Sequence, residues 1–149
     1  MTDIIITNND VANGRYLCYS SLLFLIPSAG CCYYNIDYVG QLGIITTGVS
    51  INLWRKFEFG WRRNWDLICS RIMCIVISFY FLLYSKSKYD IIYSIILLII
   101  CAYLYNSADF NNNKFWYKYH ITFHICLTFI GLFTIYKIIN FYKKSFVLL

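Results

Sequence analysis

The chain has 149 residues, of which 60% are hydrophobic and only 13% are charged. Soluble domains usually carry about 25% charged residues, so this composition excludes an ordinary soluble domain and indicates an outer surface that faces lipid. The net charge of +6 comes mainly from Lys and Arg in loops between apolar segments, which excludes the basic face of a nucleic-acid-binding domain. The lipid bilayer is therefore the expected partner, and no nucleic acid is expected.

One all-α domain, a transmembrane helical bundle of about five spans, is predicted between two short tails. Residues 1–15 form a polar N-terminal tail, residues 16–142 the membrane domain and residues 143–149 a short C-terminal tail. About 20 apolar residues cross the hydrocarbon core of a bilayer. Five apolar segments reach or approach that length, at residues 16–36, 38–54, 67–84, 91–105 and 120–142.

The first segment, residues 16–36, contains Pro27, which is expected to kink the helix. A cleaved signal peptide is the alternative, with Ser28-Ala29-Gly30 as the cleavage site. The residues before this segment hold two acids and one Arg, whereas a signal peptide begins with a basic region. A retained helix is therefore favoured.

The second segment, residues 38–54, is rich in Gly, Ser and Thr. Small residues let helices approach closely in lipid, so this helix is expected at the centre of the bundle. Gly43, Thr47 and Ser50 share one helical face with Trp54 and are predicted to pack against a neighbouring helix.

The third segment, residues 67–84, follows a loop whose tryptophans, Trp54, Trp61 and Trp65, are expected in the aromatic belt at the membrane surface. Arg71 is a candidate buried polar residue that pairs with Glu58 or with a bound anion. The alternative is that its long side chain reaches back to the lipid headgroups.

The fourth segment, residues 91–105, is the most uniformly aliphatic and is expected to face lipid. Five spans place the two termini on opposite sides of the membrane. Lys and Arg are slightly more numerous on the side of the N-terminus, which favours a cytoplasmic N-terminus. Heavy use of Ile, Tyr, Phe, Asn and Lys is typical of an AT-rich genome. This composition suggests a viral or protist protein located in an endomembrane such as the ER or in a viral envelope.

The fifth segment, residues 120–142, begins with the only two histidines of the chain, His120 and His124. Because they are four residues apart on a helix, both imidazoles can point at one ion such as zinc. Asp66 is the best candidate for a third ligand, and a zinc-bound water would act as a hydrolytic nucleophile. The alternative is two interfacial histidines that hydrogen-bond to Tyr, Ser or Asp side chains.

The pattern Ser50-x-x-x-Trp54, Asp66 and His120-x-x-x-His124 resembles the superfamily of alkaline ceramidases, adiponectin/progestin receptors and related membrane hydrolases. That superfamily is a seven-helix bundle whose three histidines hold zinc. The resemblance implies zinc ligands at His120 and His124, with Ser50 and Asp66 supporting the metal-bound water and the acyl chemistry. Trp54 stands where the third histidine belongs and five helices replace seven, which implies a trimmed relative with an altered or lost zinc site.

Three functions follow as hypotheses. The first is a non-catalytic membrane protein that acts through membrane assembly, as a homo-oligomer or with a membrane protein partner, or through interaction with lipids. The second is a divergent zinc-dependent lipid hydrolase with Ser50 and Asp66 as catalytic residues and Asp66, His120 and His124 as metal ligands. The third is a channel or transporter, which is weaker because the sequence contains neither an internal repeat nor a filter-like loop.

Overall fold

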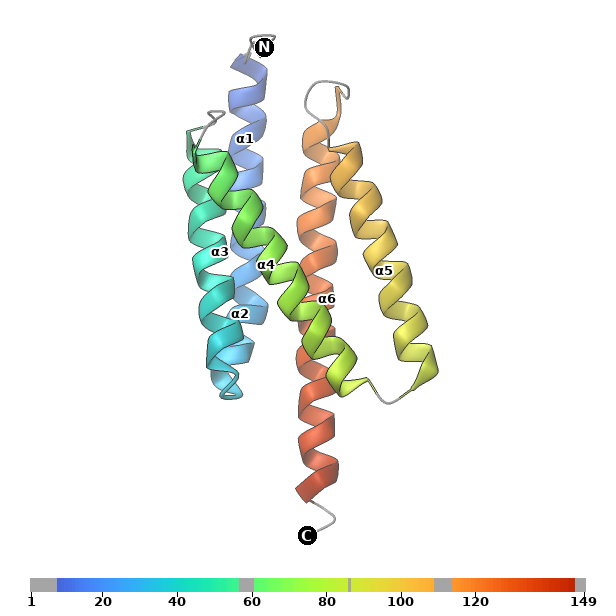
Figure 1. The fold of residues 1–149 in the computed structure, drawn as a ribbon. Helices are drawn as coiled ribbons and strands as arrows, with labels where there is room; N and C mark the ends of the chain where they lie inside the picture. The colour runs from blue at the N-terminus through green and yellow to red at the C-terminus, as the bar shows by residue number, and fades with distance from the viewer. Residues whose placement is uncertain (1–7, 57–60, 86, 109–113, 147–149) are drawn as a thin grey trace.

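The computed structural model describes residues 8–56, 61–85, 87–108 and 114–146. Every regular element in this part of the chain is helical (Figure 1), which confirms the predicted all-α bundle. The elements in chain order are α1 (Asn8–Ser21), the 3-10 turn η1 (Leu22–Phe24), α2 (Leu25–Tyr33), α3 (Asp37–Arg55), α4 (Trp61–Tyr84), α5 (Lys88–Ser107) and α6 (Trp116–Phe146).

Four helical segments are long and apolar enough to cross a membrane, namely Val11–Tyr33, Trp61–Tyr84, Lys88–Ser107 and Trp116–Tyr142. The predicted span 38–54 corresponds to α3, which is not among these four. Its Gly, Thr, Ser, Gln and Asn residues make it less apolar than its neighbours. It runs beside α1 and α2 in the bundle (Figure 1), so the protein itself provides much of its surroundings.

The first helical segment is interrupted at η1, directly before α2. Pro27 lacks an N–H group and its ring crowds the carbonyl of the residue four positions earlier, which accounts for the tighter 3-10 turn at this point. The segment also begins earlier than expected. Residues 8–15, predicted as tail, belong to α1, where the buried Gly14 brings the helix close to the rest of the bundle.

The small-residue face of α3 packs against α2. A Cβ atom added at Gly40 would lie 2.9 Å from the carbonyl oxygen of Ser28, and one added at Gly43 would overlap the Ser28 hydroxyl. Thr47 and Ser50, on the same face of α3, are also buried. This face is therefore occupied within the chain and is not an open surface for a partner.

Buried apolar clusters lie at both ends of the bundle. Leu17, Leu53, Trp54 and Trp116 form the first cluster, in which the rings of Trp54 and Trp116 stack with their centroids 5.9 Å apart. The expectation that Trp54 lies in the interfacial belt is therefore wrong, because α1 and α6 cover it. Trp61 and Trp65 are exposed, as a belt requires. Cys31, Val39 and Ile135 form a second cluster, which lies toward the opposite end.

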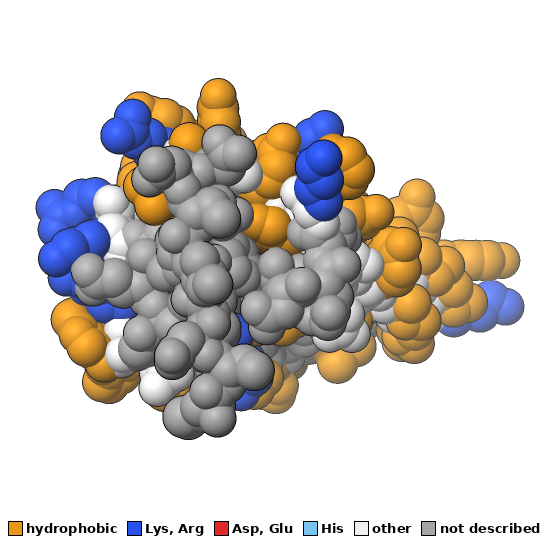
Figure 2. All heavy atoms as spheres, turned by 90° about the horizontal axis from the view of Figure 1, so that it is seen from above, with side chains coloured by type: hydrophobic (Ala, Val, Ile, Leu, Met, Phe, Trp, Pro, Cys, Tyr) orange, Lys and Arg blue, Asp and Glu red, His pale blue; other side chains and the backbone are white. Residues whose placement is uncertain are grey.

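Exposed hydrophobic side chains cover much of the outside of the bundle. Viewed from the end where α1 begins, hydrophobic side chains cover the sides, and Lys and Arg side chains lie around the rim (Figure 2). The helix α5 is the most peripheral element and most of its aliphatic side chains are exposed, as predicted. An ion pair joins it to α6, with the ammonium of Lys137 2.6 Å from a carboxylate oxygen of Asp90.

Candidate functional site

A cavity of about 340 Å³ lies inside the bundle. Helices α3, α4 and α6 provide most of its wall, Phe24 and Pro27 close it on the side of the interrupted first helix, and the end of α5 contributes Tyr105 and Asn106. Its lining includes four polar residues predicted from the sequence, which are Ser50, Asp66, His120 and His124. The antiparallel order of the helices brings these positions together, because α3 ends, and α4 and α6 begin, at one end of the bundle (Figure 1).

Ser50 and Asp66 form one polar wall of the cavity. Both side chains are buried, with 3% and 7% of their surface exposed, and the Ser50 side chain is a hydrogen-bonding neighbour of the Asp66 carboxylate. A buried carboxylate requires hydrogen bonds or a counter-charge to offset the loss of water. The small residues of α3 allow this approach, because a bulky residue at Ser50 would fill the space beside Asp66.

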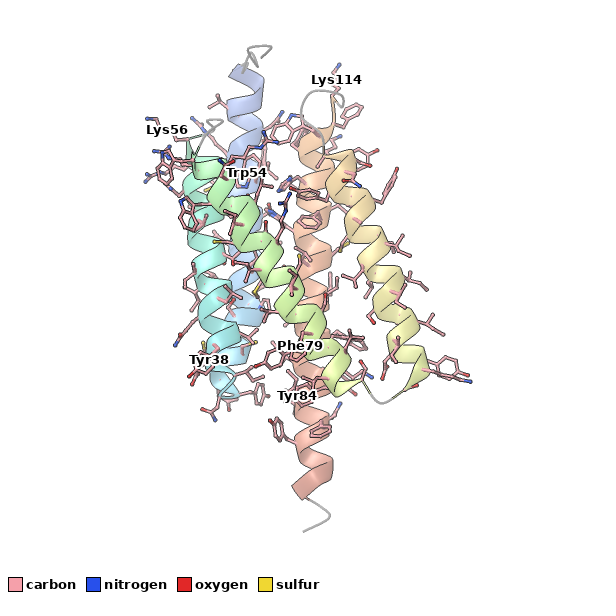
Figure 3. All side chains as sticks on the ribbon, viewed as in Figure 1. Tyr38, Trp54, Lys56, Phe79, Tyr84 and Lys114 are labelled. Atoms are coloured by element: carbon pink, nitrogen blue, oxygen red, sulfur yellow. The ribbon has the colours of Figure 1, made fainter. Side chains whose placement is uncertain are left out.

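The two histidines form the facing wall. Their ring centroids are 4.8 Å apart in an edge-to-face arrangement. His124 is buried, and its Nδ1 atom lies 2.8 Å from the hydroxyl oxygen of Ser20 on α1. The ring of His120 meets the indole of Trp54 edge to face, with centroids 5.0 Å apart. Trp54 lies toward the end of the bundle that also carries Lys56 and Lys114 (Figure 3), so the polar part of the cavity is near one end of the bundle.

Deeper in the bundle the lining is mainly apolar. Met73 and Ile77 extend the wall along α4, and Leu127 extends it along α6. Ile77 follows Asp66 by 11 positions, which corresponds to about 16 Å along a helix. The cavity therefore has a polar end near the start of α4 and an apolar end deeper in the bundle.

The polar residues of the cavity do not form a complete metal site. Structural and catalytic zinc sites use at least three protein ligands. In the described part of the chain, no group of three His, Cys, Asp or Glu side chains is placed to hold an ion. Asp66, His120 and His124 share the cavity, but they are not assembled as a three-ligand site, and the indole of Trp54 offers no metal-binding atom. Binding of zinc here stays a prediction.

Arg71 was also predicted as a buried polar residue of the membrane domain. The prediction of a buried Arg71 is wrong, because its side chain is exposed on α4. It follows Asp66 by five positions, so it points away from the cavity that Asp66 lines, and its exposure agrees with the alternative of a side chain that reaches the headgroups. Glu58, its suggested partner, lies outside the described residues.

Two residues that contact His124 were not predicted from the sequence. Ser20 and Phe24 both contact His124, with the Phe24 ring edge-to-face at 4.8 Å. They lie on a predicted lipid-spanning segment in which nothing distinguishes a cavity-facing serine from one that bonds its own backbone. A helical periodicity of Leu17, Ser20 and Phe24 was the one available signal.

Comparison with protein-family models, with curated proteins and with solved structures finds no match. The fold and the four apolar helices define the chain as an all-α, multi-pass membrane protein. The resemblance to the ceramidase and adiponectin-receptor superfamily stays a prediction.

Proposed function

We propose that this chain is a non-catalytic membrane protein that binds an amphiphile of the bilayer in its internal cavity. The observation that carries the proposal is the cavity of about 340 Å³, which combines Ser50, Asp66 and the two histidines with a mainly apolar remainder. Sites for small ligands are typically concave, mostly apolar and fitted with a few convergent polar groups. This cavity has that composition.

The distribution of polar and apolar lining favours an amphiphile over a purely polar ligand. A headgroup would meet Asp66 and His120 near the end of the bundle, while a hydrocarbon chain would run past Met73, Ile77 and Leu127. Filling an apolar space with a hydrocarbon chain is favourable because it restores van der Waals contacts that an empty space lacks. The ligand would lie with its polar end toward the membrane surface, as lipids do.

Helices α4 and α5 both line the cavity and are both long and apolar enough to cross a membrane, so the cavity adjoins the bilayer. The two helices meet near the short turn that joins them and diverge toward the other end of the bundle (Figure 1). The cavity is lined by residues of both helices, including Cys74 on α4 and Tyr105 on α5. An amphiphile that enters between them would not have to leave the membrane.

The proposal is tested by mass spectrometry of the intact protein purified in mild detergent, with Ser70→Phe as the blocking variant. Ser70 lines the cavity, and its hydroxyl donates only to carbonyls of its own helix, at Asp66 and Leu67. A phenyl ring there fills space without removing a bond between helices. Ser94→Phe on α5 is the matched control, because the Ser94 hydroxyl also donates to its own helix and the residue does not line this cavity.

We expect wild-type protein and Ser94→Phe to retain an amphiphile that Ser70→Phe has lost. Equal retention by all three proteins would place the bound molecule on the outer surface and would contradict the proposal.

A divergent zinc-dependent lipid hydrolase is the second candidate. The presence of Ser50, Asp66, His120 and His124 in one cavity favours it, because these are the positions that carry the resemblance. The Ser20 hydroxyl lies within hydrogen-bonding distance of the Leu17 carbonyl and of His124 Nδ1. When it donates to the carbonyl, its oxygen accepts a hydrogen bond from the Nδ1–H group of His124, which leaves the lone pair of the other imidazole nitrogen available to an ion.

Metal content separates the two candidates. About one zinc per chain in wild-type protein, lost in His120→Ala/His124→Ala together with hydrolysis of lipid amides or esters, would establish the hydrolase. Protein that contains no zinc but still retains an amphiphile would rule out the zinc hydrolase and support amphiphile binding.

A further inference from the structure

Among the described residues, no cationic side chain pairs with the carboxylate of Asp66. Its side chain is 7% exposed and lines the cavity. Its hydrogen-bonding neighbour is the Ser50 side chain, and no described Lys, Arg or His forms an ion pair with it. The Arg63 side chain lines the same cavity one turn earlier on α4, but it is exposed.

A carboxylate in this position is costly. Ionisable side chains within membrane segments normally pair with one another or mark a ligand path, and a buried charge without a partner is strongly unfavourable. Elsewhere the protein follows this rule, since the partly buried Asp90 pairs with Lys137. Asp66 therefore differs from Asp90 in having no counter-charge among the described residues, although it is the more deeply buried of the two acids.

Aromatic side chains surround the same space. Trp54, Trp116 and Phe123 line the cavity together with Asp66. Aromatic faces attract organic cations, and the attraction is larger where water is excluded. A buried carboxylate beside several aromatic rings is a combination that recognises an ammonium group.

We propose that the amphiphile bound in this cavity carries an organic ammonium headgroup, whose charge is paired with Asp66. This inference rests on the proposed amphiphile binding and names the chemical class of its ligand. Primary amines and quaternary ammonium groups share this chemistry, and they differ in that only the primary amine can also donate hydrogen bonds to Asp66 and to an imidazole nitrogen.

The test uses the full chain in mild detergent with Trp61→Phe/Trp65→Phe, so that both remaining tryptophans, Trp54 and Trp116, line the cavity. The probes are octadecylamine, octadecyltrimethylammonium and octadecanol, each brominated at the same chain carbon, and quenching of tryptophan fluorescence gives the Kd. We expect at least one ammonium probe to bind about tenfold or more tightly than the alcohol. The primary amine and the quaternary probe distinguish the two headgroup types.

Asp66→Asn is expected to bring the ratio of the alcohol Kd to the ammonium Kd close to one, whereas Asp66→Glu keeps the preference. Equal binding of all three probes to the protein with Asp66 intact would overturn the ammonium inference and leave amphiphile binding standing. A preference that persists in Asp66→Asn would also overturn it. Absence of quenching by any probe would overturn both the inference and the proposed function.

Discussion

His124 is positioned by a residue from the other end of the chain. Ser20 on α1 lies 2.8 Å from its Nδ1 atom, and Phe24 packs edge-on against its ring. The imidazole is buried, so a polar atom that loses its partner here has no water to replace it. These two contacts therefore set the orientation of the histidine in the cavity wall.

Replacing Ser20 with alanine tests this contact. We expect Ser20→Ala to lower the stability of the protein by about 1–3 kcal/mol, the usual cost of leaving a buried polar atom unsatisfied. Ser21→Ala is the control, because Ser21 is also buried but its hydroxyl donates only to the Leu17 carbonyl of its own helix. Thermal unfolding in detergent measures both variants, and equal melting temperatures would show that the contact with His124 contributes nothing.

At the scale of the helices, α3 depends on close approach to α2. Gly40 and Gly43 leave space that the Ser28 backbone and side chain occupy. Packing of this kind replaces the hydrophobic effect as the force that holds helices together in lipid. It also brings Ser50, on the same face of α3, to the edge of the cavity.

Alanine at Gly40 is expected to destabilise the protein by about 1–3 kcal/mol, because the added methyl group must push α2 and α3 apart. Gly48→Ala is the matched control on the same helix, since nothing lies within 4 Å of a Cβ atom added there. The higher helix propensity of alanine should leave Gly48→Ala unchanged or slightly more stable. Thermal unfolding distinguishes them, and a Gly40→Ala protein as stable as Gly48→Ala would refute the close packing.

The helix α5 packs against α6 through an apolar cluster that includes Cys101 and Leu104, and a charged contact joins the two helices near the start of α5. Lys137 and Asp90 keep 21% and 17% of their side-chain surface exposed, and the Lys137 ammonium also lies 5.1 Å from the centre of the Phe133 ring. The pair is largely shielded from water. Solvent screening therefore weakens it less than it weakens an ion pair on the surface.

Removing one member of this pair leaves the other charge without its partner. Asp90→Asn is expected to lower the melting temperature, with a loss of about 1–3 kcal/mol. The double variant Asp90→Asn/Lys137→Met should cost less than the sum of the two single variants, because no lone charge remains. Strict additivity in this double-mutant cycle would mean that the two residues do not interact.

For the whole molecule, the sequence was sufficient to predict the helical bundle and the meeting of four polar residues. Ser50, Asp66, His120 and His124 lie near helix ends that an antiparallel order must bring to one side, whatever the details of packing. The contact of Ser20 with His124 was not predictable, because it depends on how α1 is rotated next to α6. Burial of Trp54 likewise depends on how α1 and α6 cover the end of α3.

The cavity itself could not be predicted, since its volume depends on the tilt of α4 against α3 and α6. The exposure of Arg71 was within reach of the sequence, because its spacing from Asp66 turns it away from the polar wall. The extension of α1 to Asn8 was not, because residues 8–15 are polar and only packing against the bundle favours a helix there.

The most direct test of amphiphile binding is whether a membrane lipid reaches the two tryptophans of the cavity. Trp61 and Trp65 are 64% and 55% exposed, so bilayer lipid would quench them from outside, and both are replaced by phenylalanine. Trp54 and Trp116 then report on the cavity alone. In nanodiscs whose lipids carry brominated chains, we expect strong quenching in this background and in Ser94→Phe, and clearly weaker quenching in Ser70→Phe. Quenching that is absent, or unchanged by Ser70→Phe, would contradict amphiphile binding in the cavity.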